Sequence, residues 1–335
     1  MYFPWCHFTC FFLLLGFGVD LANSQTCRRV GGKILPCWTI VVDPSGHGNF
    51  TTIQSAIGSV PSNNRHWVSI NVKAGIYREK LVIRDDQPYI LLQGEGKTKT
   101  LVEWGDHDTT SQSPTFSTMA EYIVVKYISF INSYNNNPPQ PAVAALVSGD
   151  KSYFLSVGFF GFQDTLWDNY GHHYYKSCTI QGAVDFIFGA GQSLYEDCDI
   201  RVIAGRLGPG ISGYITAQGR TSLRETNGFT FKSCFINGTG TTYLGRPWKE
   251  YARVIFHNCK ILNIIQPQGW DNRPYPNFYR NQLSFGEYNN YGPGSHSPQR
   301  VKWINKLSLS TVQWMSSFAF IDTVGWLNIS LRIGY

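Results

Sequence analysis

Two aspartates have the residue type and spacing to act together in acid–base or nucleophilic chemistry. The segment Tyr153–Gly161 aligns with Tyr174–Gly182 at an offset of 21 residues, and the same offset places Asp164 over Asp185. If these segments are neighbouring parallel strands, about 4.8 Å apart, the two carboxyl groups are close neighbours. Two close carboxylates cannot both ionise easily, so one pKa rises while a nearby cation or donor can hold the other low. Such a pair supplies an acid beside a base or nucleophile, although aspartate also satisfies turn backbone, so a structural role stays open.

A second repeat indicates which elements must position this pair. The pattern Cys-x-Ile occurs four times, beginning at Cys178, Cys198, Cys234 and Cys259, with spacings of 20, 36 and 25 residues. Self-similarity at such intervals, with short strands between, is typical of a solenoid of β-rungs. The longer middle spacing predicts a loop inserted on one turn. We expect these cysteines to face inward, whether or not they are bonded.

Composition agrees with a strand-rich globular protein. The chain of 335 residues is 43% hydrophobic and 15% charged, with 33 glycines, which excludes a disordered chain and an all-helical bundle. Residues 51–60 have helical spacing and could cap an open end of the solenoid, and the tail from Ser308 to Phe320 could cover other surface. Further strands are predicted at Val68–Val72, Tyr89–Gln93, Tyr122–Phe130, Ala142–Val147, Phe229–Phe231 and Arg253–Phe256.

The N-terminus is typical of a secretory signal peptide at residues 1–24, because its apolar stretch ends near Val19 and small residues follow. We expect residues 25–335 to form one domain, since no linker divides them. Six cysteines would remain in an oxidising compartment, but the sequence does not fix their pairing. The net charge of +6 favours polyanions outside the cell, and no basic cluster with interleaved aromatics indicates nucleic-acid binding. The apolar stretch is too short to cross a membrane.

Several longer motifs resemble those of plant pectinesterases, also called pectin methylesterases. They occur in the family's order at Gly75–Glu79, Gln163–Leu166, Asp185–Gly189, Leu244–Trp248 and Glu287–Gly294. The resemblance runs from about Val41 to Val301 and implies an all-β fold, a right-handed parallel β-helix. It also implies hydrolysis of the methyl esters of homogalacturonan. Because the first family-like strand is at residues 40–42, we expect no inhibitor-like pro-domain.

The resemblance also implies roles for individual residues. Asp185 would be the nucleophile and Asp164 the general acid and then base. Arg246 would orient Asp185, and Gln163 would donate to the oxyanion. A second oxyanion glutamine usually precedes an Ala-Val-Ala-Leu strand; Gln140 is the candidate, although its spacing differs by one residue.

Substrate contacts are expected at Arg246, Trp248, Trp270 and Phe186, since an aromatic face can pack on a sugar ring. Many family members have a second tryptophan three residues after the position of Trp270, where this chain has Arg273. A cation there could favour partly de-esterified pectin. The proposed chemistry requires no cofactor or metal. The expected partner is methylesterified homogalacturonan, and some family members also bind separate proteinaceous inhibitors. We expect a secreted monomer that acts in the cell wall.

Two other functions remain open from the residues alone. A glycoside hydrolase on a β-helix could also use two carboxylates about 5 Å apart. A wall protein could instead keep the fold and bind pectin without catalysis. A pectate lyase is less favoured, because no dense acidic cluster indicates a calcium site.

Overall fold

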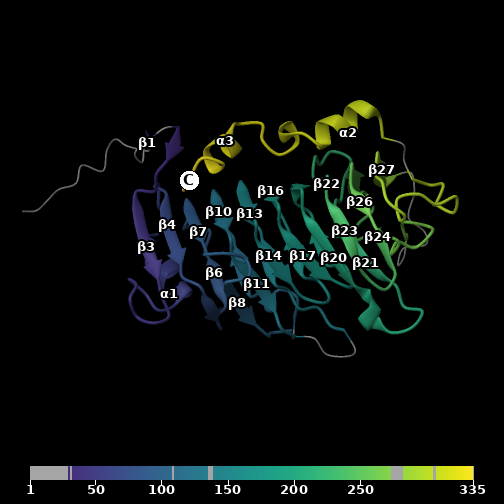
Figure 1. The fold of residues 1–335 in the computed structure, drawn as a ribbon. Coiled ribbons are helices and arrows are strands. Elements are labelled where there is room, and N and C mark those ends of the chain that lie inside the picture. The colour runs from purple at the N-terminus through teal and green to yellow at the C-terminus, as the bar shows by residue number, and fades with distance from the viewer. Residues whose placement is uncertain are drawn as a thin grey trace, which may run out of the picture.

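The structure is a computed structural model that describes residues 29–30, 32–107, 109–134, 139–272, 282–304 and 307–334. The predicted signal peptide lies outside these residues. Short strands follow one another and turn repeatedly, and they form three parallel sheets that run the length of the molecule (Figure 1). From β4 to β24, each chain turn adds one strand to each sheet, which makes the fold a right-handed parallel β-helix, as predicted.

The strands of the first sheet are β3 Trp38–Val42, β4 Val68–Val72, β7 Ile90–Gln93, β10 Ile123–Lys126, β13 Ser152–Leu155, β16 His172–Lys176, β19 Gln192–Glu196, β22 Gly228–Lys232, β25 Arg253–His257 and β27 Ser284–Tyr288. Those of the second sheet are β5 Gly75–Tyr77, β8 Thr100–Trp104, β11 Ser129–Asn132, β14 Gly158–Phe160, β17 Thr179–Gly182, β20 Asp199–Ile203, β23 Phe235–Thr239 and β26 Lys260–Ile261. Those of the third sheet are β6 Leu81–Ile83, β9 Phe116–Thr118, β12 Ala145–Val147, β15 Leu166–Asp168, β18 Ile187–Gly189, β21 Gly213–Gln218 and β24 Thr242–Pro247. A short antiparallel pair, β1 Arg29–Val30 and β2 Lys33–Ile34, precedes them.

The predicted register is confirmed. Tyr153 pairs with Tyr174 between β13 and β16, and Gly158 pairs with Thr179 between β14 and β17. The isoleucines of the Cys-x-Ile repeats also pair rung by rung. The long interval between Cys198 and Cys234 contains the 3₁₀ helix η1, Ala204–Leu207, and a loop after β21, so the predicted insertion is present.

One expected strand, Tyr122–Phe130, is wrong as a single element. It forms β10 and β11 in two different sheets, because Tyr127 adopts a left-handed backbone with φ 55° that turns the chain. The same turn recurs on later rungs at Ser156, Ser177, Asp197, Ser233, Asn258 and Asn289. Such a conformation costs a non-glycine residue about 1–2 kcal/mol, which the packing of successive rungs must offset.

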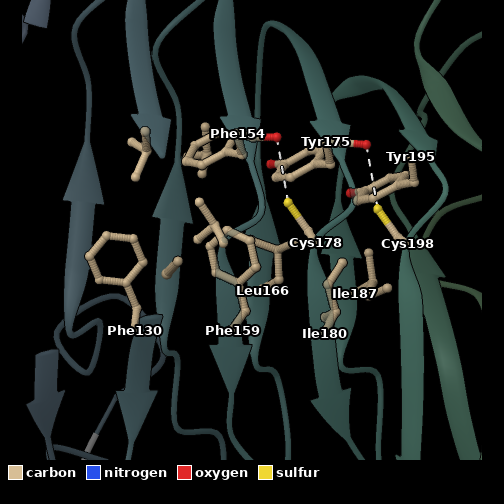
Figure 2. Close-up of a cluster of buried hydrophobic side chains, with 14 of the residues drawn as sticks. Phe130, Phe154, Phe159, Leu166, Tyr175, Cys178, Ile180, Ile187, Tyr195 and Cys198 are labelled. Atoms are coloured by element: carbon tan, nitrogen blue, oxygen red, sulfur yellow. Dashed lines mark hydrogen bonds between the residues drawn. The ribbon is translucent and has the colours of Figure 1, made fainter. Parts of the chain in front are cut away.

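Stacked side chains fill the interior. Phe154, Tyr175 and Tyr195 lie in parallel on consecutive rungs, with ring centroids 4.8 and 4.5 Å apart (Figure 2). The four repeat cysteines are buried free thiols, and those of Cys178 and Cys198 donate to the carbonyls of Phe154 and Tyr175. They therefore face inward as predicted and are not bonded to one another. A fifth cysteine, Cys37, is disulfide-bonded.

Helices cover the ends and one side of the solenoid. Helix α1, Ile53–Gly58, packs its apolar residues into the core near the N-terminal end, and the Glu79 carboxylate accepts hydrogen bonds from the first backbone N–H groups of α1. The C-terminal elements α2 Leu309–Met315, η3 Phe318–Phe320 and α3 Trp326–Ser330 lie along the first sheet and bury its outward apolar residues (Figure 1). Within the described residues, no helix is long and apolar enough to cross a membrane.

Candidate active site

Asp164 and Asp185 occupy equivalent turns on neighbouring rungs, immediately before the third-sheet strands β15 and β18. Gln163 forms a parallel bridge with Val184, and the Asp164 N–H donates to the Val184 carbonyl at 3.0 Å. The predicted stacking of the two aspartates is thereby confirmed. Both have left-handed backbones, with φ 59° and 47°. Strained residues held in this way cluster at functional sites, and both side chains stay partly accessible.

Close packing beneath the turn fixes the direction of the Phe186 side chain. A Cβ on Gly182 would lie 2.2 Å from the Cβ of Phe186, so only glycine fits there. Phe186 is 0% exposed and belongs to the central core. The prediction that Phe186 contacts substrate is therefore wrong, because successive residues of the turn point to opposite sides and this ring points inward.

Arg246 reaches Asp185 from β24, two rungs further along the solenoid. Its Nε donates to Asp185 Oδ1 at 2.9 Å, and its Nη2 donates to Oδ2, so the guanidinium holds the carboxylate by both oxygens. The guanidinium also lies 4.4 Å from the ring centroid of Tyr214 on the intervening strand β21. Such a fork is geometrically specific and favours an ionised carboxylate.

The two carboxyl groups have different electrostatic environments. Burial and the neighbouring Asp185 charge raise the pKa of Asp164 to about 8. Burial also raises the pKa of Asp185, but the hydrogen bonds and charge of Arg246 oppose this rise. Because Asp185 has the direct arginine contact, it ionises first. The geometry therefore suits a protonated Asp164 beside an ionised Asp185 near neutral pH.

The two glutamines differ in their placement. Gln163 directly precedes Asp164 and is partly exposed at the same turn. On the preceding rung, the residue in register with Gln163 is Pro141, which has no side-chain donor, and Gln140 lies one position earlier and is exposed. The register therefore supports Gln163 and does not bring Gln140 level with it. The oxyanion role of Gln140 stays a prediction.

The two tryptophans also have different surroundings. Trp248 is 38% exposed, and its ring meets that of Phe188 edge to face at 5.8 Å, so it remains a candidate wall of the site. Trp270 is 1% exposed inside the solenoid, where it stacks on Phe285 at 4.5 Å. Its predicted contact with sugar is wrong, because Phe285 and the core enclose the ring. Arg273 lies outside the described residues.

Sequence analysis did not identify Tyr214, whose ring lies against Arg246 and whose hydroxyl donates to Asp271 Oδ2 at 2.8 Å. Tyr214 could have been identified from its position on the rung between Asp185 and Arg246, but that position is known only when the strand register is known. Among the described residues, no group of three or more His, Cys, Asp or Glu side chains could hold a metal ion.

Comparisons with known proteins agree with this fold and show its family. The family model described as Pectinesterase matches residues 39–324. The chain is 54% identical over 303 residues to probable pectinesterase 55 of Arabidopsis thaliana, covering 88% of this chain and 92% of that protein. It is 55% identical over 296 residues to probable pectinesterase 29 of the same plant, covering 86% and 88%.

Solved structures are similar over the same span. The pectin methylesterase from carrot matches with a TM-score of 0.80 at 32% identity, covering 87% of this chain and 95% of that one. A pectin methylesterase from Aspergillus niger matches with a TM-score of 0.74 at 26% identity, covering 92% and 99%.

The fold and these comparisons define a β-helical ester hydrolase. The chain belongs to the pectinesterase family. This finding confirms the resemblance seen in the sequence motifs.

Proposed function

We propose that this enzyme removes methyl esters from homogalacturonan in pectin by covalent catalysis at Asp185. The observation that carries the proposal is the unequal acid pair, in which Arg246 holds one carboxylate and the other has a raised pKa. The family match and the similarity to plant pectinesterases support the reaction class. The mechanism follows from the two environments.

In the first step, an Asp185 oxygen attacks the C6 carbonyl of a galacturonosyl methyl ester. Negative charge develops on the former carbonyl oxygen, to which the Gln163 amide would donate a hydrogen bond. Asp164 transfers its proton to the departing methoxy oxygen, so methanol leaves. An anhydride then joins Asp185 to the sugar carboxyl group.

In the second step, the ionised Asp164 takes a proton from water, and the resulting hydroxide attacks the galacturonosyl carbonyl of the anhydride. The bond to Asp185 breaks and Asp185 leaves as a carboxylate, while Asp164 is again protonated. Arg246 stabilises the Asp185 anion at the start and at the end of the cycle. The product is a free galacturonate within the polymer, and these steps draw on no metal or cofactor.

The setting of the reaction is also part of the proposal. A signal peptide at residues 1–24 would direct a single domain at residues 25–335 out of the cell to the wall, where methylesterified homogalacturonan is the partner. A monomer would suffice, because one chain contributes all of the proposed catalytic residues. A separate proteinaceous inhibitor is a further proposed partner.

Methanol and new reducing ends should be measured in parallel on highly methylesterified pectin, with the wild type beside Asp185→Ala. We expect methanol without new reducing ends, and no methanol from the variant. New reducing ends would instead support a glycoside hydrolase. Pectin binding by the folded wild type without either product would support an inactive binding protein.

A further inference from the structure

A groove of about 510 Å³ lies beyond the acid pair, where the third-sheet strands end. Tyr170, which follows β15, and Ala190, which follows β18, line it together with Arg224 and Asn227 of the loop after β21. Ala190 is five residues after Asp185, with strand β18 between them, so at about 3.3 Å per residue the two lie no more than about 17 Å apart. The strands that carry the acid pair therefore lead to the groove.

The loop that forms one wall of the groove is firmly held. Arg220 is 4% exposed, and it donates from Nε to the Glu225 carbonyl at 3.0 Å and from Nη2 to the Leu223 carbonyl at 2.8 Å. Arg253 donates to the Asn227 carbonyl at 2.9 Å, and Asn227 Nδ2 donates to the Ala190 carbonyl at 2.8 Å. Two arginines thus fix the loop through its main chain. The groove is pre-formed, which lowers the entropic cost of binding.

The polar groups around the groove suit a sugar. Tyr170 is 70% exposed and offers an aromatic face that can pack on a pyranose ring. Asn227 Oδ1 is buried without a hydrogen-bond partner within the described structure, although the Nδ2 of the same side chain is bonded. An acceptor in this state is suited to a hydroxyl donor.

Arg224 gives the groove one cationic group for an anionic sugar, in a lining that also contains the carboxylates of Asp150 and Glu225. His172 pairs with Asp150 at 2.8 Å, and the Glu225 carboxylate accepts from the main chain and hydroxyl of Thr221, so these groups are already engaged. The side chain of Arg224 is exposed and takes part in no ion pair among the residues that the structure describes. Its guanidinium is available to a carboxylate.

Aromatic side chains pack between the strands that follow the acid pair and the loop that lines the groove. Trp167 on β15 stacks with Phe188 on β18 at 5.3 Å, and Phe188 meets Trp248 edge to face. Gly219, at the start of the held loop, lies so close to Trp248 that an added Cβ would be 2.8 Å from its ring. This packing links the catalytic strands to the loop that lines the groove, with Trp248 38% exposed and Phe188 4% exposed.

We infer that this groove is a distal subsite for the same galacturonan chain whose methyl ester is hydrolysed at Asp185, with Tyr170 under a sugar ring and Arg224 on a free carboxylate. The inference rests on the proposed function. It predicts that long substrates bind more tightly than short ones, because only a long chain can occupy both the groove and the catalytic site.

The test compares kcat/KM, from methanol release, on partly methylesterified pectin and on methylesterified trigalacturonate. Tyr170→Ala and Arg224→Gln should each lower kcat/KM on pectin by about three- to tenfold and leave the trimer unchanged. Tyr291→Ala and Arg65→Gln are matched controls, because both are exposed and lie on other parts of the solenoid. They should change neither value. High salt should reduce the effect of Arg224→Gln, because the contact is at the surface.

Equal losses on both substrates would overturn the inference, since the residues would then act on the catalytic centre or the fold. Unchanged values on both substrates would overturn it as well, while leaving the proposed function in place. A wild type that releases no methanol from either substrate would overturn the proposed function, and the distal subsite with it.

Discussion

Replacing Arg246 by glutamine should move the acidic limb of the pH–rate profile towards higher pH. Arg246 makes two charge-assisted hydrogen bonds to Asp185, and the two side chains are only 27% and 13% exposed. Such bonds contribute about 1.5–3 kcal/mol each; taking the lower value for partial exposure, their loss costs about 3 kcal/mol. At 1.36 kcal/mol per factor of ten, this loss raises the pKa of Asp185 and corresponds to a factor of about 100 in its ionisation.

The assay is kcat/KM from methanol release, measured from acidic to alkaline pH. Below the new limb, the Arg246→Gln variant should lose about 100-fold relative to the wild type, because Asp185 is protonated there. The alkaline limb should also move up, since Arg246 lowers the pKa of Asp164. Arg246→Lys keeps the charge without the fork and should shift less. An Arg246→Gln variant that is uniformly slower, with its acidic limb unmoved, would refute this reasoning.

Three further predictions concern stability and the oxyanion. The pKa of Asp164 in the folded protein is about 8, above its ordinary value of 3.8, so the folded state keeps a proton that the unfolded chain releases. The stability of the wild type should therefore fall as pH rises from about 4 to about 8. At pH 8, Asp164→Asn should be more stable than the wild type by about 2–4 kcal/mol in urea unfolding. A wild type that is equally stable at pH 4 and pH 8 would contradict the raised pKa of Asp164. Gln163→Ala should lower kcat for methanol release by about 100-fold or more. Gln140→Ala should change kcat less than about threefold, because Pro141 and not Gln140 is in register with Gln163. Equal losses in the two variants would show that Gln140 also reaches the oxyanion. His173 is fully buried, with Nδ1 2.5 Å from Asp168 Oδ1 and Nε2 3.0 Å from the Gly149 carbonyl, so His173→Ala should cost about 1–3 kcal/mol in urea unfolding by leaving buried hydrogen-bonding groups unpaired. Tyr195→Phe removes one hydrogen bond from the same carboxylate and should cost less, and a His173→Ala variant as stable as the wild type would contradict this reasoning.

The rung spacing and the acid pair could be predicted from the sequence because both repeat between neighbouring turns of the chain. The offset between Tyr153 and Tyr174 is a property of one chain turn, so it survives folding unchanged and predicts that Asp164 lies beside Asp185. The helix at residues 51–60 and the inward-facing cysteines follow from the same periodic burial. These features needed no knowledge of distant contacts.

The wrong predictions of substrate contacts arose where the direction of a side chain depends on how the chain turns in the folded protein. Phe186 and Trp270 are aromatic residues in motifs, and only the folded path of the chain determines that their rings point into the core. Tyr214 was missed because its contact with Arg246 joins residues 32 positions apart. The offset of Gln140 from Gln163 was visible as an irregular spacing, but the register was needed to show that Pro141 takes the level position.

The most direct test of the central claim is to trap the acyl-enzyme at Asp185. An Asp164→Ala variant lacks the base for the second step, and a galacturonate ester with a nitrophenol leaving group needs no acid for the first. We predict a burst of nitrophenol equal in amount to the enzyme, together with a galacturonosyl adduct on the peptide that contains Asp185. Steady release without a burst, with that peptide unmodified, would contradict Asp185 as the nucleophile.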